Sequence, residues 1–396
     1  MKRTGNRIDR RSFLQLAAAT SGLALWGCGP RKKEAGPTGG PGMRYRALGK
    51  TGLKVSELTF GAHGVDNAPL MRAAIDAGVT TFFTSGEYLD GREEASLGRA
   101  IRAIGIRRND LVIVTGITMR PGTPKQRILD SIDRSLGRLG TDHIDVYGTF
   151  EVCTPSDVRD EAWFDAVEEA KRAGKVGHMA LSGHCGGMQA CLNAAIEDER
   201  FEVLLFKYDF VSYPDQAEIL RRAAERGIGA IVFKVNAGNR AQEIKDLEAG
   251  GLSFRQATVK WALGNPDVSS VAVTITNFDR IKELTAAVGV KLSQSEADML
   301  RRYRDEMVGQ YCRFCRTCEG RCPHGVAVAD VMRYAMYFKY YGREKEAMRR
   351  YRALPAGRSA SACARCAGPC DAGCPFGRRT RDGLVDAHRL LDFAPV

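Results

Sequence analysis

The chain alternates two kinds of hydrophobic pattern from residue 55 onwards. Amphipathic segments such as Pro124–Leu139, Glu161–Ala173 and Asp215–Arg226 have helical periodicity, and several end at a glycine that fits a C-terminal cap, namely Gly140, Gly174 and Gly227. Short runs rich in β-branched and aromatic residues lie between the helical segments and predict strands. The predicted strands are Leu58–Ala62, Thr80–Ser85, Leu111–Gly116, Ile144–Phe150, His178–Ser182, Val203–Phe210, Ala230–Val235 and Val271–Ile275.

Eight alternating strand–helix units within about 260 residues favour an α/β fold, a parallel (β/α)8 TIM barrel. A doubly wound open sheet is the alternative. Such a sheet would carry a glycine-rich dinucleotide fingerprint after its first strand, and this chain has none there. We therefore predict a barrel over residues 43–305.

The N-terminus has the pattern of an export signal. Residues 1–27 place several basic residues before an apolar run that ends at Trp26 and is too short to span a bilayer comfortably. The run RRSFL at residues 10–14 resembles the twin-arginine signal, whose route carries proteins already folded around a cofactor. A basic amphipathic helix is the alternative. We expect an exported protein, periplasmic or anchored on the outer side of the inner membrane.

The residues that follow suggest a lipid anchor and a tether. Leu25 to Cys28 resembles a lipoprotein processing site, with Cys28 as the acylated residue. Ordinary cleavage nearby, with an unmodified Cys28, is the alternative. Residues 28–42 are rich in Gly and Pro and predict a flexible tether. A lipid on Cys28 would associate the protein peripherally with a membrane.

The formal net charge of +12 sits at the two ends of the chain. Basic residues exceed acidic ones by six in residues 1–42 and by seven in residues 306–396, which leaves the barrel region near neutral. No motif of interleaved aromatic and basic residues interrupts that region. Nucleic acid is therefore not the expected partner.

Eight of the twelve cysteines form two runs near the C-terminus. The first has the spacing C-x2-C-x2-C-x3-C-P of bacterial ferredoxins, and the second repeats it with one extra residue in the second interval. Disulfides or zinc are the alternatives, but neither explains two four-cysteine runs that each end in Cys-Pro. This spacing predicts two 4Fe–4S clusters. By analogy with two-cluster ferredoxins, the ligands would be Cys312, Cys315, Cys318 and Cys374 for one cluster and Cys363, Cys366, Cys370 and Cys322 for the other.

The segment between the two cysteine runs, residues 326–354, has helical periodicity. It looks like the helical type of ferredoxin domain rather than the short β-hairpin type. We therefore expect a helical ferredoxin-like iron–sulfur domain over residues 306–396.

Several short motifs resemble aldo/keto reductases. They are RALGKTGLKVS at residues 46–56, Phe60-Gly61, LGRA at 97–100, DVY at 145–147 and GKV at 174–176, leading to Ser182. The resemblance covers roughly residues 43–292. It implies a (β/α)8 barrel that binds NADPH and reduces carbonyls at the C-terminal ends of its strands.

The catalytic positions of that family are mostly replaced. The resemblance implies a phenol, a lysine that lowers its pKa, an aspartate that pairs the lysine, and a histidine that orients the carbonyl. Local alignment places Tyr88 at the phenol, Gly116 at the lysine, Phe83 at the aspartate and Phe150 at the histidine. A phenol titrates near about 10, so without a cationic neighbour it donates protons slowly at neutral pH.

The cofactor positions are also altered. The resemblance implies that Ser182 contacts the cofactor, but Gly183 stands where an amide usually follows, and Leu205 stands at a glutamine position. Val273-Thr274 replaces the Pro-Gly turn near the cofactor phosphate. These changes argue against tight NADPH binding and against ordinary carbonyl reduction.

The ends of the predicted strands carry many polar residues, where a barrel places its chemistry. These are His63, Glu87, Tyr88, Glu151, Cys153, His184, Cys185, Lys207, Asp209 and Lys234. His63, Glu151, His184 and Cys185 could bind a metal, although a polar rim left by a lost active site is the simpler interpretation. Cys153, Cys185 and Cys191 are expected to be small buried apolar residues rather than nucleophiles.

Two functions remain after these steps. The first is an exported oxidoreductase that passes electrons through two 4Fe–4S clusters to or from a small organic substrate or a redox partner protein, with Tyr88 as the remaining acid. The second is a non-catalytic barrel that acts as a scaffold or electron-transfer partner at the membrane surface, where its basic C-terminal region could meet an acidic protein.

Overall fold

The computed structural model describes residues 42–120, 122–183, 187–211, 215–236, 248, 252–307 and 312–392. The leader at residues 1–27, Cys28 and most of the tether lie outside these ranges, as do His184 and Cys185. Among the helices of the described ranges, none combines the length and the apolar character needed to cross a membrane.

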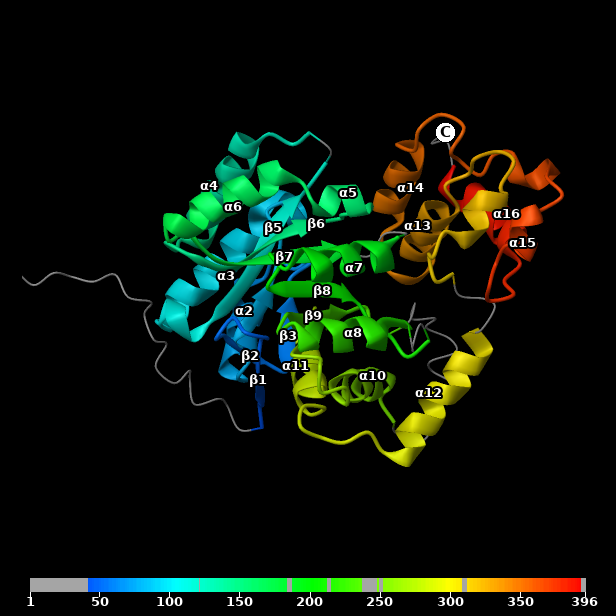
Figure 1. Ribbon diagram of the computed structural model, residues 1–396. Helices are drawn as coiled ribbons and strands as arrows, with labels where there is room; N and C mark the ends of the chain where they lie inside the picture. The colour runs from blue at the N-terminus through cyan, green and yellow to red at the C-terminus, as the bar shows by residue number, and fades with distance from the viewer. Residues whose placement is uncertain are drawn as a thin grey trace, which may run out of the picture. The chain divides into compact units, whose positions relative to one another are not determined.

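Eight parallel strands close into a barrel in the order β10-β3-β4-β5-β6-β7-β8-β9, which confirms the predicted fold (Figure 1). Both faces of these strands are buried, as in β6 and β8, because the interior is packed with side chains and helices cover the outside. The strands are β3 (Leu58–Gly61), β4 (Thr81–Phe83), β5 (Val112–Thr118), β6 (Ile144–Phe150), β7 (Val176–Gly183), β8 (Val203–Lys207), β9 (Gly229–Phe233) and β10 (Ser270–Thr274).

Helices surround the barrel and bury one apolar face each against the outside of the strands. Gly140 has a φ of +68° and caps the helix before it, as its position in the sequence predicts. The surrounding helices are α2 (Ala68–Asp76), α3 (Arg92–Ile104), α4 (Lys125–Leu139), α5 (Pro155–Val158), α6 (Glu161–Arg172), α7 (Met188–Asp198), α8 (Asp215–Glu225), α10 (Phe254–Leu263) and α11 (Phe278–Thr285).

A short antiparallel hairpin covers the N-terminal end of the barrel. It consists of β1 (Tyr45–Ala47) and β2 (Lys54–Ser56). Leu48, Leu53 and Val55 from this hairpin join the apolar cluster that fills the barrel interior. Because that end is closed, the C-terminal end is the one left open for a site.

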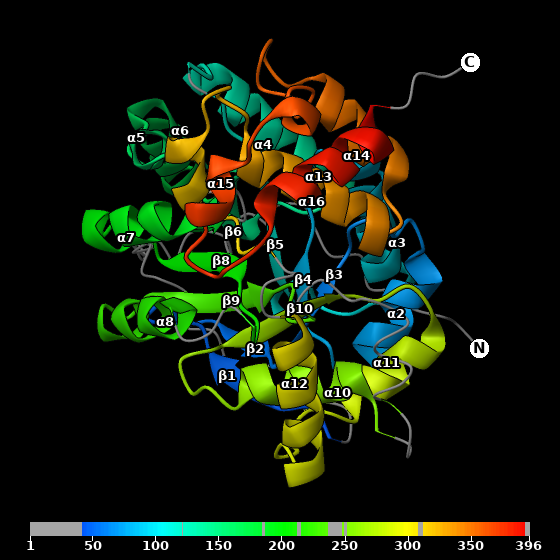
Figure 2. The ribbon, with the colours of Figure 1, turned by 90° about the vertical axis from the view of Figure 1, so that its right-hand side faces the viewer.

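Residues 312–392, which we call the C-terminal segment, are helical. Its main helices α13, α14 and α16 pack against one another (Figure 2). The helix that leads into it, α12 (Gln294–Met307), runs two residues beyond the predicted boundary at 305. The elements are η3 (Thr317–Arg321), α13 (Val328–Tyr340), α14 (Glu344–Arg352), η4 (Cys363–Arg365), α15 (Pro369–Ala372) and α16 (Thr380–Leu391).

A second apolar cluster joins the C-terminal segment to the barrel. In this cluster the ring centroids of Phe254 on α10 and Tyr303 on α12 lie 4.9 Å apart, and Phe210 after β8 lies 5.7 Å from Tyr303. Val331 and Leu384 of the C-terminal segment belong to the same cluster. The segment is therefore held against the barrel by a continuous hydrophobic core.

Candidate functional site

A cavity of about 770 Å³ lies at the C-terminal ends of the barrel strands. We call it the shared cavity, because the barrel lines one side of it and helices α13 and α14 of the C-terminal segment line another. The barrel contributes His63, Phe83, Tyr88, Glu93, Phe150, Glu151, Ser182, Phe233 and Lys234, among others. The C-terminal segment contributes Tyr337, Tyr340, Tyr341, Arg343, Glu346, Arg349 and Arg350.

Phenylalanine rings form the floor of the shared cavity. Phe83 contacts Phe150 edge-on, with centroids 5.6 Å apart, and stacks against Phe233 at 6.2 Å. A Cβ atom added to Gly116 would lie 2.0 Å from the carbonyl oxygen of Gly148 and 2.8 Å from the Phe150 ring. The lysine position of the reductase tetrad is therefore closed by packing.

Tyr88 and His63 lie together on one wall. Their ring centroids are 4.4 Å apart. Burial raises the pKa of Tyr88, because the phenolate would lose its hydration. Burial, followed by the nearby charge of Arg343, lowers the pKa of His63 to about 4. At neutral pH this wall presents a neutral phenol and a neutral imidazole.

Glu93, in the first turn of α3, is a buried acid on the same side of the cavity. Its side chain is 0% exposed. The backbone N–H of Gly64 donates to its Oε1 atom, whereas Oε2 has no hydrogen-bond partner. Burial raises its pKa to about 8, so the carboxyl group is mostly protonated at neutral pH. Sequence reasoning missed Glu93, because a glutamate in a charged helix start gives no signal of burial.

Lys234, just after β9, reaches across to the C-terminal segment. Its Nζ atom donates a hydrogen bond of 3.3 Å to the Tyr337 hydroxyl on α13. Burial lowers the pKa of Lys234 well below its ordinary value, and the charges of Arg333 and Arg343 lower it further. Lys234 also has a φ of +57°, a left-handed conformation that is strained for a lysine. The sequence placed Lys234 on the rim, but could not show that its partner lies about a hundred residues away.

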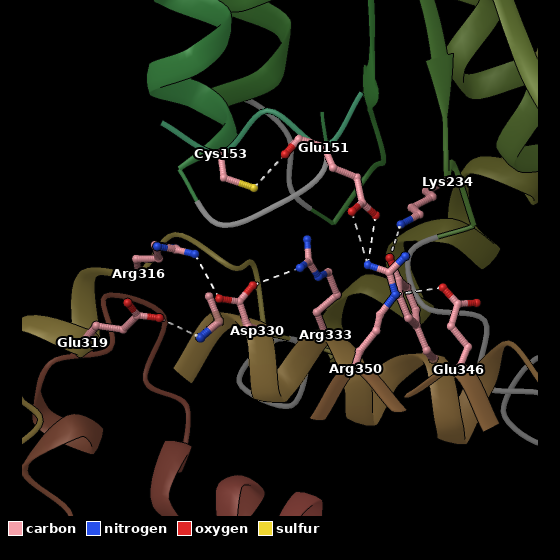
Figure 3. A network of polar contacts seen from close by, with 11 residues as sticks. Glu151, Cys153, Lys234, Arg316, Glu319, Asp330, Arg333, Glu346 and Arg350 are labelled. Carbon is pink, nitrogen blue, oxygen red and sulfur yellow. Dashed lines mark hydrogen bonds and ion pairs between the residues drawn. The ribbon is translucent and has the colours of Figure 1, made fainter. Parts of the chain in front are cut away.

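An ion pair connects the barrel to α14, and further ion pairs lie within α13 and α14 (Figure 3). Arg350 contacts Glu151 of the barrel at 3.0 Å and Glu346 of its own helix at 2.9 Å. Arg333 contacts Asp330 at 2.9 Å, and its Nε and Nη1 atoms are buried without a hydrogen-bond partner. These contacts fix the side of the cavity that the C-terminal segment supplies.

The cysteines near the barrel differ from one another. Cys191 on α7 is buried and free, as expected. Cys153, after β6, is disulfide-bonded, so the expectation that it is a small apolar residue is wrong. The sequence alone could not show this, because a disulfide requires two cysteines to lie close together in the fold.

The residues that line the shared cavity include positions that the resemblance connects with a cofactor. Ser182 lies at the end of β7 and lines the cavity, as does Thr274 at the end of β10. Arg255 and Arg280 also line the cavity. Burial, followed by the charge of Arg255, lowers the pKa of Arg280. Two guanidinium groups close together could hold an anionic group there.

The two cysteine runs interleave in the C-terminal segment. Burial raises the pKa of Cys318 to about 12, and the cysteines whose charges contribute to this shift are Cys312, Cys315, Cys374 and, more weakly, Cys370. The pKa of Cys363 is raised to about 11 by burial and by Cys322, Cys370 and Cys366. The charges that act on each of these two thiols come from cysteines of both runs, so the two runs lie near each other, and the ligand sets stay a prediction.

A close backbone contact accompanies this interleaving. A Cβ atom added to Gly373 would lie 3.2 Å from the Cα atom of Cys318. Within the described ranges, no group of three or more His, Cys, Asp or Glu side chains converges enough to hold a single metal ion. Each thiolate of a 4Fe–4S cluster binds a different iron, so such a cluster does not need the sulfur atoms to converge on one point.

Comparisons with known proteins agree with this fold. Residues 63–249 match the family model described as "Aldo/keto reductase family". The chain contains an aldo/keto reductase family domain. The uncharacterized oxidoreductase YrpG of Bacillus subtilis is 26% identical to this chain, over 65% of this chain and 95% of its own length. The versiconal hemiacetal acetate reductase of Aspergillus parasiticus is 24% identical, over 65% of this chain and 96% of its own length.

Two further relatives define how far this evidence reaches. An aldo-keto reductase of Bacillus halodurans has the same fold, with a TM-score of 0.54, 21% identity, and coverage of 66% of this chain and 96% of that one. A probable voltage-gated potassium channel subunit beta of Arabidopsis thaliana is 27% identical, over 63% of this chain and 92% of its own length. The family match and the relatives from Bacillus subtilis and Aspergillus parasiticus support an oxidoreductase, and about a third of this chain lies outside the match to each of these two relatives.

Proposed function

We propose that this protein is an iron–sulfur oxidoreductase that acts on a small molecule bound in the shared cavity. The observation that carries the proposal is the joint lining of that cavity by the barrel and by the segment that contains the eight cysteines. A redox centre placed beside a substrate cavity is suited to exchange electrons with its occupant. The barrel alone would need a complete nicotinamide site for the same task.

The donor set fits two 4Fe–4S clusters. Cys312, Cys315, Cys318 and Cys374 would hold one, and Cys363, Cys366, Cys370 and Cys322 would hold the other. The interleaving of the two runs and the contact between Gly373 and Cys318 support this division. When bound, such clusters supply one-electron transfer.

The residues of the cavity supply protons and exclude water. Glu93 holds a proton at neutral pH on an inward-facing carboxyl group, and the Tyr88 phenol lies on the same side. The rings of Phe83 and Phe150 keep the floor apolar. NADPH-dependent hydride transfer is not favoured, because the tetrad lysine has no room at Gly116.

We also propose that the protein is exported by the twin-arginine route. The basic N-terminus, the RRSFL run and the short apolar stretch support this. A lipid on Cys28 would then hold the protein at the outer side of the inner membrane. Export in the folded state suits a protein whose clusters are inserted before transport.

A non-catalytic role is the second candidate. The packing of Phe150 into the space above Gly116 favours it, because that packing removes the ancestral chemistry of the barrel. In this case the barrel would serve as a scaffold that docks the C-terminal segment to a redox partner. Such a protein would carry clusters but would turn over no substrate.

The experiment that tests the proposal uses the full chain purified without oxygen. We expect about eight irons per chain and an electron paramagnetic resonance signal after reduction by dithionite. The visible absorbance of the reduced clusters should then recover when a panel of quinones and aromatic carbonyl compounds is added. Absence of iron would refute the proposal. Intact clusters that no compound reoxidises would favour the scaffold.

A further inference from the structure

We infer that the shared cavity recognises a planar aromatic molecule that carries a carboxylate, and that Arg343 of the C-terminal segment binds this carboxylate. The inference rests on the proposed function, because it names the substrate class for the same cavity. It assigns recognition to a residue outside the barrel. Arg343 lines the cavity from the start of α14.

The floor of the cavity selects a flat apolar body. Phe83, Phe150 and Phe233 all line the cavity, and each is less than a tenth exposed. The centroid distances of 5.6 and 6.2 Å place the three rings next to one another. Aromatic ligands stack on such surfaces or meet them edge-on. A highly polar sugar or a short acid would leave these rings without a partner.

The opposite side of the cavity carries a positive charge that the protein neutralises poorly. Within the described part of the chain, the carboxylate that pairs with Arg343 is that of Glu346, at 3.9 Å. Glu346 is already bound by Arg350 at 2.9 Å, and Arg350 also pairs with Glu151 at 3.0 Å. Arg343 therefore has donors to spare for a ligand, and it is less exposed than Arg349, the other guanidinium group that lines the cavity from α14 without an ion pair in the described residues.

The charge of Arg343 acts on several side chains that line the cavity. The charge lowers the pKa of His63 and Lys234, and it opposes the rise that burial causes in the pKa of Tyr88 and Glu93. These four side chains come from different parts of the barrel and all line the cavity. A ligand in the cavity would therefore also lie within the field of Arg343.

The other acidic groups do not cancel this charge. Glu93 is mostly protonated at neutral pH, and Glu151 is paired with Arg350. Glu87 and Asp90 line the cavity from exposed positions, where water screens them. An anionic oxygen of a ligand is therefore the group best placed to neutralise Arg343. A carboxylate matches the fork of a guanidinium group with two hydrogen bonds.

The size of the cavity agrees with a ligand larger than a three-carbon acid. Its volume of about 770 Å³ is in the range that holds molecules with one or more rings. An aromatic acid would place its ring on the phenylalanine floor and its charge at α14. Both parts of the cavity would then be filled by one molecule.

Binding of two probes of equal shape tests the inference without turnover. The probes are 2-naphthoate and its neutral amide, 2-naphthamide, titrated calorimetrically into the oxidised holoprotein. A charge-assisted pair with Arg343 predicts at least a tenfold preference for the naphthoate. Arg343→Met should abolish the preference and leave the affinity for naphthamide within about twofold.

Two further variants complete the design. Lys345→Met removes the same charge from the exposed side of α14, outside the cavity lining, and should leave the preference unchanged. Phe83→Leu removes one ring of the floor and should weaken both probes by a similar factor. Equal affinity of the wild type for both probes, or a preference that survives Arg343→Met, would overturn the inference.

The same samples separate this inference from the proposed function. If naphthoate shows no preference while a neutral compound reoxidises the clusters, the substrate class is wrong and the proposed function stands. If naphthoate binds through Arg343 but the protein carries no iron, the proposed function is wrong although the cavity selects the anion.

Discussion

Replacement of Glu93 by glutamine tests whether the shared cavity holds a protonated acid. Glu93→Gln keeps the size of the side chain and removes the ionisable group. The carboxyl group is 0% exposed and one of its oxygen atoms has no partner, so its ionised form is poorly solvated. The position in the first turn of α3 favours the anion by only about 0.3–1 kcal/mol, less than the opposing effect of burial.

The magnitude follows from the shift of the pKa. The pKa of Glu93 rises from an ordinary value of 4.5 to about 8 in the folded protein. Between these two pKa values the folded protein keeps a proton that the unfolded chain has lost. The free energy of unfolding therefore falls as the pH rises through this interval. At about 1.4 kcal/mol per pKa unit, the loss between pH 6 and pH 8 is at most about 2.7 kcal/mol. Little is added above pH 8, where the folded protein also loses the proton, so we expect roughly 1.5–2.5 kcal/mol between pH 6 and pH 9.

The assay compares urea unfolding of the wild type and Glu93→Gln, both with their clusters, at pH 6 and pH 9. Other titrating groups cancel in the difference between the two proteins. The variant should gain roughly 1.5–2.5 kcal/mol relative to the wild type on going from pH 6 to pH 9. The control is Glu94→Gln, which breaks contacts with Arg138 and Thr115 and should destabilise at both pH values. A pH-dependent difference below about 0.5 kcal/mol for Glu93→Gln would show that Glu93 is ionised throughout, against the reasoning above.

Three further predictions concern the cysteine runs and the barrel floor. Cys374→Ser and Cys322→Ser should each remove the electron paramagnetic resonance signal of one cluster. The signal lost in Cys374→Ser should be the one that is also lost when a cysteine among Cys312, Cys315 and Cys318 is replaced. Loss of the other signal would contradict the proposed ligand sets. Gly373→Ala should lower the iron content, because its Cβ atom would press on the backbone of Cys318 in the first run. Gly320→Ala is the control and should keep the iron content, because the space around Gly320 is open. Equal iron content in both variants would argue against the close contact. Gly116→Lys should destabilise the barrel by about 3 kcal/mol or more, measured by thermal unfolding, without producing NADPH-dependent reduction.

The barrel could be predicted from the sequence because its elements are local. Each strand is a short apolar run bounded by turns, so the predicted Ile144–Phe150 coincides with β6, and the others differ from the observed strands by a few residues at most. The replacement of the tetrad stays a prediction, since it depends on residue identity at locally aligned positions. The lack of space for a side chain at Gly116 could not be predicted, because the position of the Phe150 ring depends on packing between two strands.

The side of the cavity formed by the C-terminal segment could not be predicted. Arg343 and Tyr337 lie in a stretch whose sequence shows only a charged, aromatic helical pattern. Their placement over the barrel depends on a hydrophobic core between segments distant in the chain. Glu93 stayed hidden for a related reason, since burial of a carboxyl group depends on what packs over it.

Because of the order of the cysteines along the chain, the side of the shared cavity formed by α13 and α14 would depend on a single cluster. Helices α13 and α14 lie in an excursion of about forty residues between Cys322 and Cys363, and the structure brings these two cysteines near each other. A cluster that joins them would fasten both ends of the excursion at its base. Oxygen damage to that one cluster would then loosen Arg343 and Tyr337 together, although neither touches iron. Under the proposed function, the binding of substrate would then depend on the supply of iron, because a chain without this cluster would lose the side of the cavity that carries Arg343.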